Sequence, residues 1–430
     1  MGTSVPGDRN AQMKTLFIFG TRPEAIKLCP VIRHMKSLPD YFDVRICVSG
    51  QHRHMLDQVL RAFDVIPDWD LNIMRPGQTL YQSTSHIIAA LEPIFIKERP
   101  DIAFVQGDTT TTLCGALTAF YGKVPVAHVE AGLRTGDPYE PFPEEMNRIL
   151  TGRIATLHFA ATASAAHNLY SEGVAPSTVA ITGNTGIDAV LHIKQLLQTG
   201  KLKGHSNFSP DPSKKLIVVT AHRRESFGAG FDAICRAITN LARRNDVQIV
   251  YPVHPNPNVR RVVDRHLRDQ RNIILLEPMD YVPFIDLMCK AHLLLTDSGG
   301  IQEEAPSLGK PVLVLREKTE RPEAVAAGTS RLVGTNEHQI LAEAERLLDD
   351  LTAYKTMARS YNPYGDGKAS ERIASFVMKE ERPAPAVADD FRRSTHEGGL
   401  RKDCLPSRLL SCKGPYCAVA TNQCKEEVAE

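Results

Sequence analysis

The sequence of 430 residues predicts an α/β protein with two Rossmann-like domains that face a central cleft. Short apolar runs of strand length alternate with segments whose apolar residues recur at helical spacing, and this alternation is typical of parallel βαβ units. The pattern begins near residue 13, is interrupted by a polar stretch over residues 200–213, and then starts again. The length also favours two or three domains over one.

The first domain is predicted over residues 13–185, with strands at 15–19, 44–48, 102–105 and 124–129. A helix is expected after Pro23, because proline is tolerated in the first turn of a helix. Another is expected over residues 84–97, where Ile87, Leu91 and Ile94 lie on one face. A further helix separates the last two strands. In such parallel sheets, ligands bind beyond the carboxyl ends of the strands.

The second domain is predicted over residues 186–360, with strands at 216–220, 249–253, 273–276, 293–296 and 312–315. Phe231, Ile234, Ile238 and Leu241 mark one face of a helix after the first of these strands. Residues 361–380 are expected to form a C-terminal helix that returns toward the first domain. The two halves therefore repeat one architecture.

Residues 381–430 differ from the rest of the chain. Only eight of these 50 residues are Leu, Ile, Val or Phe, too few to build a core, so we expect a disordered tail. Its cysteines, Cys404, Cys412, Cys417 and Cys424, are separated by intervals that match no familiar zinc site. A small redox or metal module is the alternative interpretation.

Charge and hydropathy exclude several classes of protein. The chain has 51 basic and 50 acidic residues, a balance that argues against binding nucleic acid or an anionic membrane by bulk charge. No apolar run approaches the roughly 18 residues of a membrane span, and the polar N-terminus lacks a secretory signal. We therefore expect a cytoplasmic protein. The five cysteines before the tail are expected to be reduced thiols among apolar segments: Cys29, Cys47, Cys114, Cys235 and Cys289.

Three carboxylates follow predicted strands of the first domain. Asp108 comes after the strand at 102–105, Glu130 after the strand at 124–129, and Glu144 after the loop that follows. If they converge in the cleft, they shift one another's pKa values, which suits acid–base chemistry. The alternative is that Asp108 caps a helix and that the others are solvated or salt-bridged. Residue pattern alone leaves these interpretations equal.

Cations and small residues occupy the corresponding places in both halves. Arg22 and Lys27 lie at a helix start after the first strand, where a helix N-terminus already favours anions. In the second half, His222 follows one strand, and a Ser298–Gly300 turn, with Glu304 one helical turn on, follows another. Such a turn lets backbone amides approach a phosphate. Pattern alone thus predicts a cleft enzyme for a phosphorylated, nucleotide-linked substrate.

Seven motifs carry a resemblance over residues 14–379. They are FGTRPEAIK, GDTTTT, HVEAGLRTGD, PEEMNR, HRRESFG, TDSGGIQEEAPSLGKPV and ERPEAV. Together they resemble the non-hydrolysing UDP-N-acetylglucosamine 2-epimerase family. The resemblance implies a GT-B fold, a homodimer, no cofactor, no metal, and reversible conversion of UDP-N-acetylglucosamine to UDP-N-acetylmannosamine for surface polysaccharides. In that family UDP leaves carbon 1 while carbon 2 is deprotonated, giving 2-acetamidoglucal, and UDP then adds back.

The resemblance also implies roles for individual residues. Asp108, Glu130 and Glu144 match the catalytic carboxylates, and His222 matches a histidine that stabilises the departing diphosphate. The matching contacts to the UDP-sugar, beyond Asp108, Glu130 and His222 themselves, are Arg22, Lys27, Met279, Phe284, Ser298, Gly299, Gly300, Glu304 and Arg321. Gln51 and His52 match a site where some relatives bind a second UDP-N-acetylglucosamine as activator.

Two other functions remain open at this stage. One is a GT-B glycosyltransferase, or a hydrolysing relative that releases N-acetylmannosamine. The other is a UDP-sugar sensor without catalysis. Retention of all three carboxylates favours epimerisation over both, because a transferase needs fewer acid–base groups and a sensor needs none.

Overall fold

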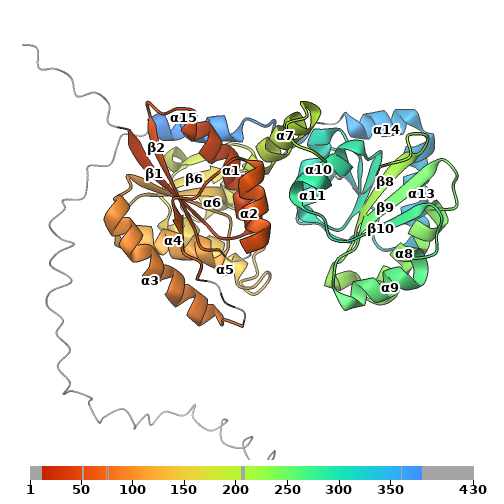
Figure 1. Ribbon diagram of the computed structural model, residues 1–430, viewed down its shortest axis with the longest axis horizontal. Helices are drawn as coiled ribbons and strands as arrows, with labels where there is room; N and C mark the ends of the chain where they lie inside the picture. The colour runs from red at the N-terminus through yellow and green to blue at the C-terminus, as the bar shows by residue number, and fades with distance from the viewer. Residues whose placement is uncertain are drawn as a thin grey trace, which may run out of the picture. The chain divides into compact units, whose positions relative to one another are not determined.

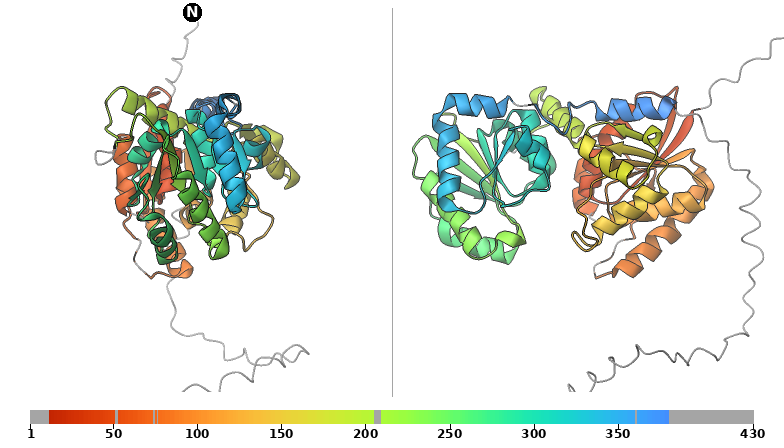
Figure 2. Two further views of the ribbon diagram at one scale, coloured as in Figure 1. Left: turned by 90° about the vertical axis from the view of Figure 1, so that its right-hand side faces the viewer. Right: turned by 180° about the vertical axis from the view of Figure 1, so that it is seen from behind.

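A computed structural model describes residues 12–50, 53–73, 75, 77–204, 209–359 and 361–379. It confirms the predicted α/β class with two Rossmann-like domains. A seven-stranded sheet has the order β3-β2-β1-β4-β5-β6-β7, and a six-stranded sheet has the order β10-β9-β8-β11-β12-β13. Helices cover both faces of each sheet (Figures 1 and 2). The predicted tail, residues 381–430, lies outside the described residues.

The first sheet and its helices extend from residue 13 to residue 198. Every strand pair recorded in it is parallel. The strands are β1 (Met13–Phe19), β2 (Phe42–Val48), β3 (Trp69–Asp70), β4 (Ile102–Gln106), β5 (Val126–Ala131), β6 (Leu157–Ala160) and β7 (Val179–Ile181). The helices are α1 (Arg22–Lys36), α2 (Arg53–Ala62), α3 (Leu80–Glu98), α4 (Thr110–Tyr121), α5 (Glu144–Ile154), α6 (Ala163–Ser171) and α7 (Thr185–Gln198).

The second sheet repeats the plan with shorter strands, again in parallel pairs. The strands are β8 (Lys215–Thr220), β9 (Val247–Pro252), β10 (Ile273–Leu276), β11 (Leu293–Thr296), β12 (Val312–Val314) and β13 (Ser330–Leu332). Its helices are α8 (Ala229–Leu241), α9 (Pro257–Leu267), α10 (Tyr281–Lys290), α11 (Gly299–Glu304), α12 (Pro322–Ala326), α13 (Glu337–Asp349) and α14 (Leu351–Ala358), and the last described helix of the chain is α15 (Ala369–Lys379).

Strand β1 shows why the core has two layers. Leu16 and Ile18 belong to one cluster of buried side chains, whereas Phe17 and Phe19 belong to another. Successive side chains of a strand point to opposite faces, so β1 is apolar on both. Phe17 also stacks on Phe104 of β4, with ring centroids 4.5 Å apart. This buried, two-sided strand explains the continuous apolar run in the sequence.

The expected thiols are reduced. Cys29, Cys47, Cys114 and Cys235 are free and buried, and Cys289 is free and half-buried. Burial raises the pKa of Cys235 to about 12, so its thiol stays protonated. No helix within the described residues combines the length and apolar content needed to cross a membrane.

Helix α15 packs against α1 and α7 of the first domain (Figure 1). Asp188 of α7 accepts hydrogen bonds from the backbone amides of Ala369 and Ser370, at 3.2 and 2.8 Å. These amides begin α15 and have no partner within their own helix, so a carboxylate from another helix caps it.

Replacement of Asp188 by alanine is expected to lower the free energy of unfolding by about 1–3 kcal/mol, because two buried amides lose their acceptor. The matched control is Asp366→Ala, which removes an exposed ion pair with Arg372 of α15 and an exposed hydrogen bond from the Lys368 amide, and it is expected to cost at most about 1 kcal/mol. Urea unfolding followed by circular dichroism measures both. Equal losses in the two variants would show that the cap contributes nothing beyond a surface contact.

Candidate active site

The candidate residues lie at the switch point of each sheet. In the first sheet β1 and β4 are parallel neighbours, and the strands that follow β1 are added on one side of this pair while those that follow β4 are added on the other. In the second sheet β8 and β11 have the same relation. A crevice opens between such strands at their carboxyl ends. Arg22 and Asp108 follow β1 and β4, while His222 and Ser298 follow β8 and β11.

Glu24 fastens the turn after β1 to the turn after β4. One carboxylate oxygen accepts hydrogen bonds from the amides of Gly20 and Thr21, at 3.0 and 2.7 Å. The other accepts from the hydroxyls of Thr109 and Thr112, at 2.7 and 3.2 Å. Burial raises the pKa of Glu24, and these hydrogen bonds oppose the rise. In the motif FGTRPEAIK, Glu24 thus has a structural role, because its hydrogen bonds join the turn after β1 to the residues that follow β4.

Gly20 is required by close approach. A Cβ atom at this position would lie 2.0 Å from the Ser49 hydroxyl oxygen and 2.8 Å from that of Thr111. The absence of a side chain at Gly20 therefore lets the ends of β1 and β2 and the start of α4 approach one another closely.

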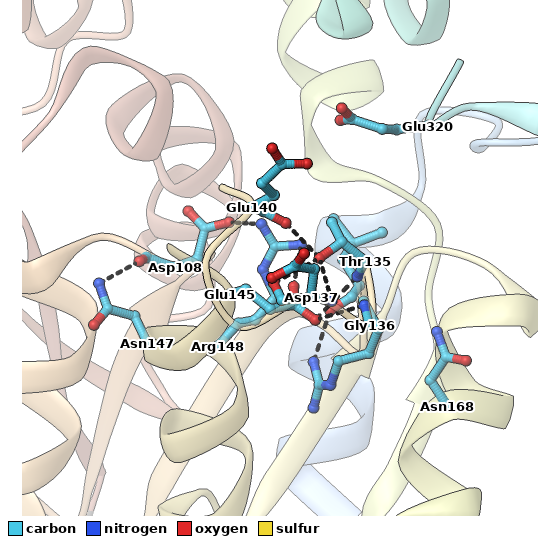
Figure 3. Close-up of polar contacts among 12 residues, drawn as sticks. Asp108, Thr135, Gly136, Asp137, Glu140, Glu145, Asn147, Arg148, Asn168 and Glu320 are labelled. Carbon is cyan, nitrogen blue, oxygen red and sulfur yellow. Dashed lines mark hydrogen bonds and ion pairs between the residues drawn. The ribbon is translucent and has the colours of Figure 1, made fainter. Parts of the chain in front are cut away.

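Asp108 is held by two residues of α5, Asn147 and Arg148 (Figure 3). Its carboxylate accepts a hydrogen bond of 2.6 Å from Arg148, and its carbonyl accepts one of 2.9 Å from the Asn147 side chain. The preceding Gly107 has a φ of +71°, and its carbonyl lies 2.7 Å from the ring Nε2 of His128. Burial raises the pKa of Asp108, and the Arg148 and Lys27 cations oppose that rise. Asp108 is therefore neither a helix cap nor a freely solvated acid.

Glu130 forms an ion pair with Lys27 and accepts a 3.0 Å hydrogen bond from Gln106. The strand was expected to end at residue 129, but β5 continues through Glu130 to Ala131. Glu130 has a φ of 63°, and the register between β5 and β6 shifts there. A positive φ is unusual in a non-glycine residue, and this local irregularity at the strand end accompanies the approach of Glu130 to Lys27.

Lys27 lies among charges from both halves of the chain. Burial lowers its pKa, but the Glu130 and Glu303 carboxylates outweigh this effect and raise the pKa above its ordinary value. Glu303 is itself paired with Arg321, and it accepts a 2.8 Å hydrogen bond from Asn184. The Glu303 carboxylate raises the pKa of Arg321. A small pocket is lined by members of this group, namely Glu130, Asn184, Glu303 and Arg321.

Glu144 is the first residue of α5, and no side chain caps this end of the helix. It is half-buried, and its charge raises the pKa of Asp108. A carboxylate at this position is stabilised by the helix dipole. The charges of Glu144 and Lys27 thus both act on Asp108, and Lys27 is paired with Glu130, so electrostatic effects link the three predicted carboxylates.

His222 lies in a second group. Its ring stacks on that of His254, with centroids 4.8 Å apart, and its Nδ1 is 3.6 Å from the Asp297 carboxylate. The other oxygen of Asp297 accepts the amides of His222 and Arg223, at 2.6 and 2.7 Å. Burial lowers the pKa of His222, although the Asp297 carboxylate acts to raise it. The lowered pKa favours a neutral imidazole at neutral pH.

The residues expected to contact the nucleotide divide into two sets. Gly299 and Gly300 begin α11 after Ser298, whose side chain makes no capping hydrogen bond. A Cβ atom added at Gly299 would lie 3.8 Å from the Arg321 guanidinium. Met279 precedes α10 and Phe284 lies within it, and both side chains are half-buried against the core.

Glu304 is an acid whose pKa is strongly raised. Burial raises its pKa to about 8, with the neighbouring Glu303 charge adding to the rise and Lys27 and Arg22 opposing it. The buried hydroxyl of Tyr281, which interacts with Glu304 and Arg22, has no hydrogen-bond partner among the described residues.

The positions of Gln51 and His52 lie outside the described residues. Five residues that the motif analysis did not single out make the principal contacts described above. They are Glu24, Glu145, Arg148, Asp297 and Glu303. All five stand inside the quoted motifs, within four positions of a predicted site residue, so the charged residues of each motif were the signal that could have found them.

Comparison with known proteins yields one family. A family model described as UDP-N-acetylglucosamine 2-epimerase matches residues 36–378. The UDP-N-acetylglucosamine 2-epimerase of Escherichia coli (strain K12) is 56% identical over 375 residues, which cover 86% of this chain and 99% of that enzyme.

Two solved structures extend the comparison. The UDP-GlcNAc 2-epimerase from Neisseria meningitidis bound to UDP-GlcNAc is 47% identical, with a TM-score of 0.78 over 86% of this chain and 100% of that chain. The enzyme from Methanocaldococcus jannaschii in complex with UDP-GlcNAc and UDP is 33% identical, with a TM-score of 0.67 and the same coverage. This likeness confirms the expected GT-B fold.

The buried histidine that holds the Gly107 carbonyl generates a pH prediction. Burial lowers the pKa of His128 to about 3, from an ordinary value of 6.5. Between these values the unfolded chain binds a proton that the folded chain does not, so stability is lost as pH falls from 6.5 toward 3. In His128→Gln this loss should be smaller, by up to about 1.4 kcal/mol per pH unit.

Melting temperatures between pH 7 and 4.5 measure this difference. The control is His167→Gln, because His167 is exposed on α6 and should leave the pH dependence of the wild type unchanged. A His128→Gln protein as acid-sensitive as the wild type would contradict the assignment of His128 as a buried neutral group.

Proposed function

We propose that this chain, which belongs to the UDP-N-acetylglucosamine 2-epimerase family, interconverts UDP-N-acetylglucosamine and UDP-N-acetylmannosamine by inverting carbon 2. The observation that carries this proposal is the electrostatic linkage of Asp108 with Glu144 and Lys27, and of Lys27 with Glu130, at the carboxyl ends of β4 and β5 and the start of α5. A site of this kind provides several acid–base groups in one place, as inversion of a carbon centre requires.

The chemistry explains the need for several carboxylates. Carbon 2 has no adjacent carbonyl, so a carbanion there would be very unstable. In the proposed reaction a base removes the proton at carbon 2 while the bond between carbon 1 and oxygen breaks, and its electron pair leaves with UDP. The resulting 2-acetamidoglucal then accepts UDP at carbon 1 and a proton at the opposite face of carbon 2. A base on one face and an acid on the other are therefore needed.

The remaining residues would hold the departing diphosphate and the nucleotide. Arg22, Lys27 and Arg321 supply positive charge, and the amides of Gly299 and Gly300 are free to donate at a helix start. His222, kept in place by Asp297 and His254, is suited to donate a hydrogen bond to the leaving group. Met279, Phe284 and Glu304 would contact the uridine.

Incubation of the enzyme with UDP-N-acetylglucosamine in heavy water, followed by proton NMR, tests the proposal. We expect UDP-N-acetylmannosamine to form, with deuterium at carbon 2 of both sugars. Asp108→Asn is expected to reduce turnover by about 10²–10⁴-fold, because a positioned acid–base group is lost. Free N-acetylmannosamine with UDP would instead indicate hydrolysis, and an unchanged spectrum despite UDP-sugar binding would favour a transferase or a sensor.

We further propose that two copies of the chain associate through the first domain. Helices α3, α4 and α5 pack side by side, and Phe120 and Tyr121 at the end of α4 are 60% and 63% exposed. With Ile154 of α5 they line an open hollow. Exposed aromatic side chains gathered in a hollow are typical of contact sites, and the family resemblance makes a second copy the expected occupant.

Sedimentation measures the association. The wild type is expected to behave as a dimer, and the double variant Phe120→Glu, Tyr121→Glu is expected to behave as a monomer, because two charges would be buried in the contact. Ile66→Glu is the control, since Ile66 is 76% exposed on a loop of the same domain. A double variant that sediments with the wild type would place the contact elsewhere.

We also propose that the enzyme works in the cytoplasm. All five cysteines of the described part are free, and four of them are buried. Reduced thiols are the rule in reducing compartments, whereas secreted proteins tend to form disulfides.

A further inference from the structure

Helix α5 contributes more than Glu144 to the proposed active site. Glu145 and Arg148 follow on the same helix, and residues four apart, such as Glu144 and Arg148, lie on one face. Asp108 is in contact with Arg148 and interacts with the charge of Glu144. One face of α5 therefore carries both the Glu144 carboxylate and the Arg148 guanidinium that act on Asp108.

Arg148 makes two ionic contacts from a nearly buried position. Its side chain is 12% exposed, one terminal nitrogen is 2.6 Å from Asp108, and the other is 3.3 Å from Glu145 (Figure 3). A planar guanidinium has fixed donor directions, so two such contacts orient it in a way that a lysine ammonium cannot reproduce.

Glu145 anchors this arrangement. Its side chain is fully buried, and its second oxygen accepts the amides of Thr135 and Gly136, at 3.0 and 3.2 Å. These amides belong to the loop that joins β5 to α5 (Figure 3). A buried carboxylate must keep its partners, because an uncompensated charge is costly to bury. Glu145 thus fixes Arg148 on one side and the loop on the other.

We infer that Arg148 is a positioning residue, which, held by Glu145, fixes the carboxylate of Asp108 in the proposed active site. This inference rests on the proposed function, because it assigns Asp108 to the reaction. The charged groups that face Asp108 are Arg148 and Glu144 from α5 and Lys27 from α1. Within the part of the chain that the structure describes, Arg148 is the one residue that forms an ion pair with Asp108. Removing Arg148 should therefore leave Asp108 misplaced and more easily protonated.

Four variants separate positioning from a structural effect. Arg148→Gln removes the ion pair with Asp108. Arg148→Lys keeps the positive charge but cannot contact Asp108 and Glu145 through two separate terminal nitrogens. The double variant Arg148→Gln, Glu145→Gln avoids leaving a buried carboxylate unpaired, in case the single variant does not fold. Arg153→Gln is the control, because Arg153 is an exposed arginine of the same helix.

The kinetic measurement compares kcat, KM and the pH–rate profile for conversion of UDP-N-acetylglucosamine. Arg148→Gln and the double variant are expected to lose roughly 10²-fold in kcat with KM changed less than about threefold, the cost of a small misplacement of a reacting group. Arg148→Lys should recover part of the loss, and Arg153→Gln should match the wild type. In an Asp108→Asn background, Arg148→Gln should cause little further loss, because the residue acts through Asp108.

A second measurement does not depend on activity. Carbon-13 NMR of protein labelled at aspartate carboxyl carbons, with the Asp108 signal identified by its loss in Asp108→Asn, reports the Asp108 titration directly. We expect the midpoint to rise in Arg148→Gln and to stay at the wild-type value in Arg153→Gln. An unchanged midpoint would overturn the inference, as would an Arg148→Gln enzyme with wild-type kcat. A wild type that gives no UDP-N-acetylmannosamine would refute the proposed function alone, since the titration would still decide the role of Arg148.

Discussion

The ion pair between Lys27 and Glu130 joins helix α1 to the end of β5, and the other charged contacts are arranged around it. Lys27 interacts with Asp108 on the neighbouring strand end and with Glu303 of the second half of the chain. A buried cation cannot remain charged without acids near it, and several buried acids cannot remain charged without a cation. The electrostatic balance of one lysine therefore constrains four segments of the chain.

Each buried acid in this region has a specified set of partners. Glu24 has backbone amides and threonine hydroxyls, Glu145 has two amides and Arg148, and Asp297 has two amides next to His222. Buried pairs of this kind add little net stability, but loss of one partner is expensive. Their value is conformational, since each partner fixes one loop. Glu145 fixes Arg148, which contacts Asp108, whereas Asp297 fixes His222 itself.

Much of this could be predicted from the sequence, and the limits have physical causes. Apolar runs and the residues that follow them located Asp108, Glu130, Glu144 and His222 at strand or helix ends, because parallel strands bring their carboxyl ends to one edge. The supporting contacts could not be predicted, because they join residues far apart in sequence: Arg148 meets Asp108 across 40 positions. The positive φ of Glu130 was also hidden, since nothing in the motif distinguishes it from an extended residue.

The three carboxylates occupy three different environments, and this difference bears on how one site can serve two faces of a sugar. Glu130 faces a lysine, Asp108 faces an arginine, and Glu144 stands at an uncapped helix start. For Asp108 the effect of the partners is explicit, because burial raises its pKa, Arg148 and Lys27 oppose that rise, and Glu144 adds to it. In a reversible reaction, the group that gives a proton in one direction must take it in the other, so the group that holds the proton differs between the two directions. The partners of Asp108, and not its carboxylate alone, thus decide how readily it takes part in that exchange.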